Sequence, residues 1–219
     1  MIRNPFGRRF PKIIIKYGKL LDPIFIFYCK NNPDLKARGW NDWIPPTQEE
    51  IFKRIEDYKK EWSKYETKIL KSICAVFNLR FKRNMIDVYI VSGNPRQLSA
   101  PIIIKSGFSP NEFVDSLSHE LIHKLFEDNG KRIPMSIFDE MFPGETNAVK
   151  NHVVVHSALK YIYLNILKDD ERLERNINSS KKHTTSDYLR AWEIVEKEGY
   201  VEIIKKFKSK IKKRIVRKN

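Results

Sequence analysis

The chain has 219 residues, with 42 lysines and arginines against 27 acids and a formal net charge of +15. This length suits one domain, or one domain with an appendage, and 41% apolar residues are enough to build a hydrophobic core. The two cysteines, Cys29 and Cys74, exclude a disulfide framework, and the lack of a CxxC pair excludes a thiolate zinc site. No run approaches the ~20 apolar residues of a membrane helix, and no signal-peptide core follows the basic N-terminus. We therefore expect a cytoplasmic protein without a membrane span.

The first 46 residues predict an N-terminal arm. Residues 13–17 and 24–29 are rich in Ile and Phe, which favours two short strands or a packing arm. Residues 31–46 contain several prolines and a glycine, so they predict a loop, and Trp40 and Trp43 are expected to anchor it.

A long helix is predicted next. Thr47 and Glu50 form a capping box, and apolar residues then alternate at spacings of three and four to about Phe77. Residues 85–91 and 101–105 predict two strands.

The strongest helix start lies at Ser109, where Pro110 and Glu112 supply a first-turn proline and a capping-box acid. This helix is expected to run over 110–129, with Gly130 as its C-terminal cap.

The C-terminal part predicts three further helices. Residues 131–144 read as a linker, and a helix is expected from 145 or 146 to about 167. Residues 169–183 are polar and predict a mobile loop. A helix over 186–197 follows, and a basic helix runs on from Gly199.

The motif that carries chemistry is His119-Glu120-Leu121-Ile122-His123, an HExxH sequence. Residues four apart share a helix face, so both imidazoles can bind one Zn²⁺, while Glu120 can take a proton from the zinc-bound water. The two middle residues are apolar and are expected to face the core. HExxH also occurs by chance, but a well-capped amphipathic helix favours the metal interpretation.

The histidines are few and paired. They are His119, His123, His152, His156 and His183. His119 and His123 form one i,i+4 pair and His152 and His156 form another, on two predicted helices. Histidines scattered through a core would not be expected to pair in this way.

Residues 47–167 resemble the core of zincin metallopeptidases, in the order of backing helix, strands, HExxH helix and third-ligand helix. In the gluzincin branch the last helix carries Asn-Glu-x-x-x-Asp, and here Asn151-His152-Val153-Val154-Val155-His156 stands at the similar place. Order and size are similar to the small archaeal minigluzincins. The resemblance implies an α+β fold with a small sheet and further C-terminal helices.

This sequence departs from the gluzincin pattern at the third ligand. The resemblance places His152 where the family has the glutamate ligand, and His156 where it has the aspartate that orients a histidine. Three histidines with an open water position form a sound zinc site. Glu145 is the alternative third ligand, because it lies on the same helical face as His152 and its distance from His123 is one that gluzincins also use.

Other site candidates are weaker. Asp115 and Glu127 continue the i,i+4 row of the HExxH helix and can accept a hydrogen bond from a ligand imidazole. Zincins stabilise the oxyanion with Tyr, His or Arg, and Tyr188 and His183 are the candidates here.

The C-terminus is basic. Nine Lys/Arg and no acid lie between Lys205 and Lys218, with apolar residues at helical spacing among them. Such a helix can bind nucleic acid or another polyanion, or simply pack with a solvated cationic face.

These observations predict an N-terminal arm (1–46), a zincin-like catalytic core (47–168) and a loop with basic helices (169–219). The expected function is a zinc metallopeptidase acting on a peptide or protein substrate, with Glu120 as general base. One alternative is a DNA-associated zincin protease of the SprT-like or repressor-cleaving type. The other is a non-catalytic nucleic-acid or partner-binding protein with a vestigial HExxH.

Overall fold

The computed structural model describes residues 10–37, 39–94, 96–181 and 186–216. Their contacts divide the chain into two compact units. The first contains the described residues up to Glu66 together with Arg83–Glu120, and the second contains Thr67–Lys82 and the described residues from Leu121 onward. Two helices, α3 (Gln48–Phe77) and α4 (Pro110–Asp128), run through the boundaries. The coarse α+β class is confirmed.

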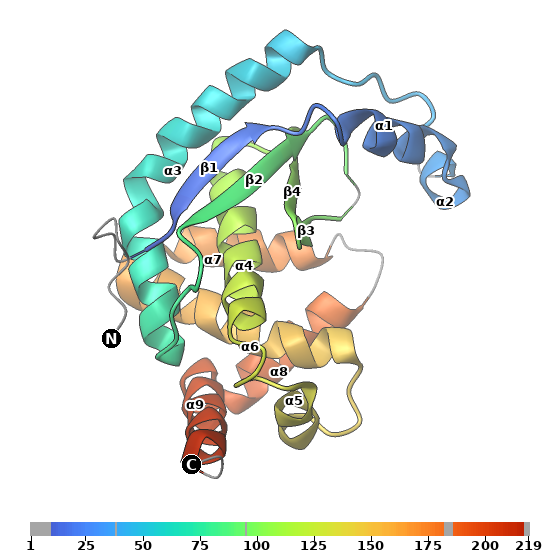
Figure 1. Ribbon diagram of the computed structural model, residues 1–219. Helices are drawn as coiled ribbons and strands as arrows, with labels where there is room; N and C mark the ends of the chain where they lie inside the picture. Colours follow the sequence, from blue (N-terminus) through green and yellow to red (C-terminus); the bar gives the residue numbers. More distant parts are fainter. Residues whose placement is uncertain (1–9, 38, 95, 182–185, 217–219) are drawn as a thin grey trace. The chain divides into compact units, whose positions relative to one another are not determined.

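A mixed four-stranded sheet forms the middle of the first unit (Figure 1). Strands β1 (Lys12–Tyr17), β2 (Met85–Val91) and β4 (Ile102–Lys105) are parallel, and β3 (Leu98–Ser99) pairs antiparallel with β4. The order is β1-β2-β4-β3. The predicted strands at 13–17, 85–91 and 101–105 are confirmed, while the two-residue β3 was not predicted.

The sheet buries one face. Alternate residues of β1 and β2, among them Ile15, Val88 and Ile90, are buried, as period-two alternation requires. On the opposite face, Lys16 pairs with Asp87 at 2.9 Å and lies over the Tyr89 ring.

The predicted strand at 24–29 is wrong, because these residues belong to helix α1 (Asp22–Asn31). Pro23 stands in the first turn, where its fixed φ favours a helix start. The buried Asp22 carboxylate holds that turn in place. It accepts hydrogen bonds from the Ser92 N–H and hydroxyl, both at 2.6 Å, and from the Tyr17 hydroxyl at 2.7 Å.

The segment between α1 and α3 is mostly loop, as predicted, but it contains the short helix α2 (Pro33–Lys36). Trp40 and Trp43 lie with ring centroids 5.4 Å apart and pack against Gly93, after β2. A Cβ at Gly93 would come within 2.6 Å of the Trp43 ring, so the absence of a side chain there makes room for the indole.

Both capping boxes are confirmed. Thr47 and Glu50 exchange hydrogen bonds of 2.7 and 3.2 Å at the start of α3. Ser109 and Glu112 do the same at the start of α4. Within the first unit, Tyr58 of α3 stacks on Phe113 of α4 at 4.3 Å, which packs the two helices together.

The second unit is helical. It contains α5 (Met135–Met141), α6 (Asn147–Tyr161), a π-helix η1 (Ile162–Leu167), α7 (Asp170–Lys181), α8 (Asp187–Glu198) and α9 (Tyr200–Val216). The predicted helices at 145–167, 186–197 and after Gly199 are confirmed. The predicted linker at 131–144 contains α5. The predicted loop at 169–183 is wrong for 170–181, which form α7.

Aromatic side chains fill much of the core of the second unit. Phe77 and Phe126, near the ends of α3 and α4, contact each other and Phe207 of α9, and Phe138 of α5 adjoins them. This phenylalanine cluster holds α9 in the fold. Among the described residues, no helix is both long and apolar enough to cross a membrane.

Candidate metal centre

The HExxH sequence lies in the second half of α4, a continuous helix, so His119 and His123 stand one turn apart on one face. Leu121 and Ile122 are fully buried, as predicted for the middle positions. His119 is buried, and His123 is only partly accessible. The helix therefore presents a histidine pair beside a packed apolar face.

His152 comes from α6. Thr146 caps this helix by accepting a hydrogen bond from the Val149 N–H at 3.2 Å. His152 Nδ1 lies 2.7 Å from the Ala148 carbonyl oxygen. Because a carbonyl can only accept, this bond places the proton on Nδ1 and leaves the Nε2 lone pair available to a metal.

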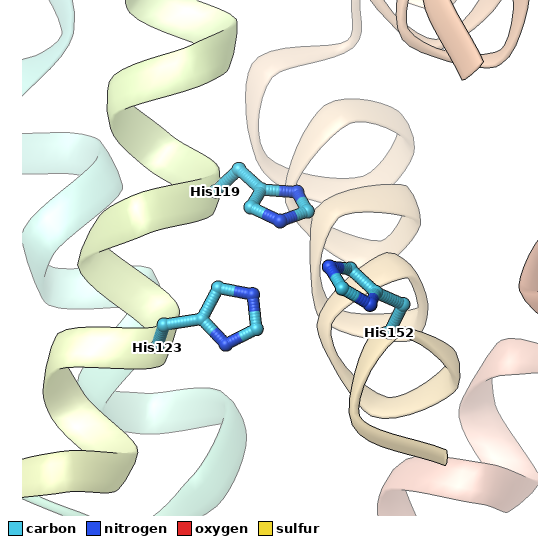
Figure 2. A group of neighbouring side chains, drawn as sticks. All are labelled: His119, His123 and His152. Atoms are coloured by element: carbon cyan, nitrogen blue, oxygen red, sulfur yellow. The ribbon is translucent and has the colours of Figure 1, made fainter. Parts of the chain in front are cut away.

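The three histidines form one cluster (Figure 2). One ligand nitrogen from each of His119, His123 and His152 lies within 4.8 Å of the other two. The rings of His123 and His152 are 5.1 Å apart between centroids and inclined at 74°. In a tetrahedral site with zinc–nitrogen bonds of about 2.0–2.1 Å, the ligand nitrogens lie about 3.4 Å from one another. Small movements of the three rings would therefore bring their nitrogens to zinc-binding distance. The donor set fits a zinc ion with one open position.

Burial sets the charge state of this cluster. It lowers the pKa of His123 to about 3, with a smaller contribution from His152, so the imidazole is in the neutral, metal-binding form at pH 7. Glu120 follows His119 directly, and burial raises the pKa of its carboxyl to about 8. A cation bound nearby would favour the carboxylate form again.

Glu145, the alternative third ligand, lies outside the histidine cluster. Its carboxylate accepts hydrogen bonds from Arg190 Nη2 at 2.8 Å and Nε at 3.2 Å. It precedes the capping residue of α6, whereas His152 lies inside that helix. The structure thus brings His152, and not Glu145, to the HExxH pair.

His156 lies one turn after His152 on α6 and is almost completely buried. Its ring stacks on Trp192 of α8 at 4.3 Å and 13°, and its centroid is 5.7 Å from that of His152. The Trp192 Nε1 donates a hydrogen bond to Ser180 Oγ at 3.1 Å, which fixes the indole. His156 therefore packs between Trp192 and His152. Its role in orienting a metal ligand stays a prediction.

Tyr188 of α8 lies against the cluster. Its ring centroid is 4.2 Å from that of His152, and the residue is half-buried. Of the two candidates for oxyanion stabilisation, Tyr188 is therefore beside His152, while His183 lies outside the described residues. The contact between Trp192 and His156 could not be found from the sequence, because no local pattern links the two residues.

The two acids proposed to orient the ligands differ in their surroundings. Asp115 is buried one turn before His119 on α4. Glu127 is about half exposed and pairs with Lys124 at 2.7 Å. Asp115 therefore has the environment of a group that can fix an imidazole, and Glu127 has that of a surface acid.

Comparisons of this chain with protein-family models, with curated proteins and with solved structures found no match.

Proposed function

We propose that this chain is a zinc-dependent metallopeptidase that hydrolyses peptide bonds in peptide or protein substrates. The observation that carries the proposal is the cluster of His119, His123 and His152, with Glu120 next to the first of them. Three imidazoles and an adjacent carboxyl group make up the residue set of a catalytic zinc site with an open position.

Each residue of the cluster has a distinct part in this proposal. His119, His123 and His152 would hold the ion, and the bond from His152 to the Ala148 carbonyl orients its ring. A zinc ion held there supplies Lewis acidity toward the scissile carbonyl and lowers the pKa of a bound water to about 7. Glu120 accepts a proton from the attacking water and passes it to the departing amine.

Tyr188 is suited to stabilise the oxyanion. A hydroxyl near a ligand histidine can donate a hydrogen bond to the carbonyl oxygen as negative charge develops on it. The contact between the rings of Tyr188 and His152 supports this role.

The sheet restricts where an extended substrate can be aligned. Strand β2 pairs with β1 from Met85 to Ile90 and with β4 from Val88 to Val91, so its second half is paired on both sides and offers no edge to a peptide. Among the described residues, β3 pairs with Ile102 and Ile103 of β4 but not with Ile104 or Lys105, which leaves that part of β4 open to strand addition on its β3 side. Of β2 and β4, the two strands predicted at 85–91 and 101–105, β4 is therefore the better suited to align an extended substrate.

The order of elements also supports a zincin-like core. A long capped helix, parallel strands, the HExxH helix and the helix with the third histidine follow one another as the resemblance implies. Gluzincins bind zinc with two histidines and a glutamate, whereas the cluster here has a third histidine, His152. This difference favours a zincin-like peptidase in which a histidine replaces the glutamate ligand.

A second candidate function, a DNA-associated protease of the same chemistry, is favoured by one observation. On α9, Ile203, Phe207 and Ile211 are buried, while Lys205, Lys206, Lys208 and Lys212 are exposed. The helix is thus both packed and cationic, and salt-dependent DNA binding would distinguish this candidate.

The proposal is tested by zinc content and proteolysis together. Elemental analysis should find about one zinc per chain in the wild type and in Glu120→Gln, and none in the double variant His119→Ala/His123→Ala. On denatured protein substrates, Glu120→Gln should be slower by roughly 10²–10⁴-fold, because the amide cannot accept the proton. Undiminished hydrolysis by Glu120→Gln, or no hydrolysis by the zinc-loaded wild type, would contradict the peptidase function.

A further inference from the structure

Helix α1 carries large apolar side chains on its solvent side. Ile24, Phe27 and Tyr28 expose 65%, 68% and 47% of their surface, and Leu20, just before the helix, exposes 90%. Ile24, Phe27 and Tyr28 stand three and one residues apart, which places them along one side of the helix, and Leu20 lies in the turn that precedes it. We call these four residues the α1 stripe.

The orientation of α1 follows from its opposite side. Asp22 and Cys29, two turns apart, are both buried. The Asp22 carboxylate is fixed by two hydrogen bonds to Ser92 and one to Tyr17. Turning the stripe inward would pull this carboxylate out of its bonds, so the fold itself keeps the stripe exposed.

The area of the stripe helps to identify what covers it. Large apolar side chains present about 150–250 Å² each, so these exposed fractions leave on the order of 500 Å². Isolated exposed apolar residues are ordinary, whereas an area of this size equals that of the largest apolar patch on a typical monomer, which is often a functional surface. A stable protein interface needs about 800 Å² on each partner, so the stripe alone is too small to hold a second copy of the chain.

The charges around the stripe point to an anionic surface. Lys19 and Lys30, one near each end of α1, are exposed, while Asp22, the one acid of the helix, is buried with its oxygens engaged. Protruding aliphatic and aromatic side chains between lysines are the features of segments that lie in the membrane interface, where lysines reach the headgroups.

We propose that α1 docks the protein on anionic lipid membranes by inserting Leu20, Ile24, Phe27 and Tyr28 at the headgroup boundary, with Lys19 and Lys30 contacting acidic headgroups. The helix lies on the membrane and does not span it. This surface belongs to the first unit and is independent of the chemistry of the histidine cluster.

Co-sedimentation with vesicles tests this docking in the full-length protein. The wild type should bind vesicles of phosphatidylcholine with phosphatidylglycerol more tightly than vesicles of phosphatidylcholine alone. Ile24→Ser/Phe27→Ser should weaken binding by about a hundredfold or more, because inserting each large apolar side chain is worth about tenfold or more. Lys19→Gln/Lys30→Gln should weaken binding to the anionic vesicles about fivefold for each lysine.

The matched control is Met85→Ser/Val201→Ser, which removes two exposed apolar side chains outside the stripe and should change binding less than twofold. Circular dichroism should be unchanged in all variants, since the substituted side chains are exposed. Three outcomes overturn the proposal: no vesicle binding by the wild type, equal binding by Ile24→Ser/Phe27→Ser, or self-association of the wild type that this variant abolishes. If the wild type and Ile24→Ser/Phe27→Ser bind vesicles equally and added salt abolishes the binding, the interaction belongs to a charged surface outside the α1 stripe, such as α9.

Discussion

His152 and Glu145 provide the sharpest test at the scale of single residues, because their surroundings differ. His152 has its Nδ1 bonded to Ala148 and its ring beside His123, whereas Glu145 is engaged by Arg190. We expect His152→Ala to weaken zinc affinity by more than the 10–100-fold typical of residues that only orient a ligand. Glu145→Gln should change it less than threefold. Competition with a chromophoric chelator measures both, and the reverse ranking would make Glu145 the ligand.

Tyr188 allows a substitution that separates packing from chemistry. Tyr188→Phe keeps the ring that lies 4.2 Å from His152 and removes only the hydroxyl. If the hydroxyl stabilises the oxyanion, kcat should fall by about 10²–10³-fold, while KM and zinc content stay near the wild-type values. Steady-state kinetics on one peptide measures this. A variant as fast as the wild type would leave Tyr188 as a packing residue, and a variant without zinc would mean that the hydroxyl holds the site together.

At the scale of elements, capped helices were predictable because their signals are local. Thr47 with Glu50 and Ser109 with Glu112 mark helix starts by side-chain chemistry that needs no tertiary contact. Residues 24–29 were misread because Ile and Phe suggested a strand, although Pro23 in the first turn was an available helix signal.

Helix α7 was missed for a different reason. Its sequence is so polar overall that it was predicted as a loop, although its few apolar residues, Leu173 and Ile177, stand at helical spacing. Two contacts hold its start in place. Asp169 accepts a hydrogen bond from the Arg172 N–H at 2.9 Å, and the buried Arg172 side chain pairs with the same carboxylate at 3.2 Å. A buried arginine of this kind is a tertiary feature that composition does not reveal.

In the candidate site, too, the local features could be predicted from the sequence and the tertiary contacts could not. The motif predicts that His119 and His123 share a helix face, because both lie on one helix. The approach of His152, and the contacts of Tyr188 and Trp192, depend on how α6 and α8 pack, which no local pattern specifies.

The packing of α8 on α6 should determine the stability of the second unit. Trp192→Ala removes a buried indole that stacks on His156, and should lower the free energy of unfolding by about 3–5 kcal/mol. Trp192→Phe keeps an aromatic ring but loses the bond to Ser180, and should cost about 1–2 kcal/mol. Urea denaturation measures these values, with the exposed Glu193→Gln on the same helix as a control expected within about 0.5 kcal/mol. A Trp192→Ala cost near that of the control would contradict the packing argument.

At the scale of the whole molecule, the charge of +15 favours association with polyanions, and α9 is the segment placed to contribute. Phe207 anchors α9 in the phenylalanine cluster, and Lys210 pairs with Glu140 at 2.7 Å, so the helix is part of the fold. Deleting it would expose that core, and substitution of its exposed lysines is therefore the informative change.

The last prediction concerns DNA binding by this exposed charge. Affinity of the wild type for duplex DNA should fall linearly with salt on a log–log plot, because binding releases condensed counterions. Replacing Lys205, Lys206, Lys208 and Lys212 by glutamine should reduce the slope by about 0.9 for each phosphate that the helix no longer neutralises. The matched control replaces four exposed lysines of α3, Lys53, Lys59, Lys60 and Lys64, which removes the same charge elsewhere. Fluorescence anisotropy at several salt concentrations gives both slopes. Equal reductions in the two variants would assign binding to net charge alone, and only a selective reduction in the α9 variant supports a DNA-associated protease.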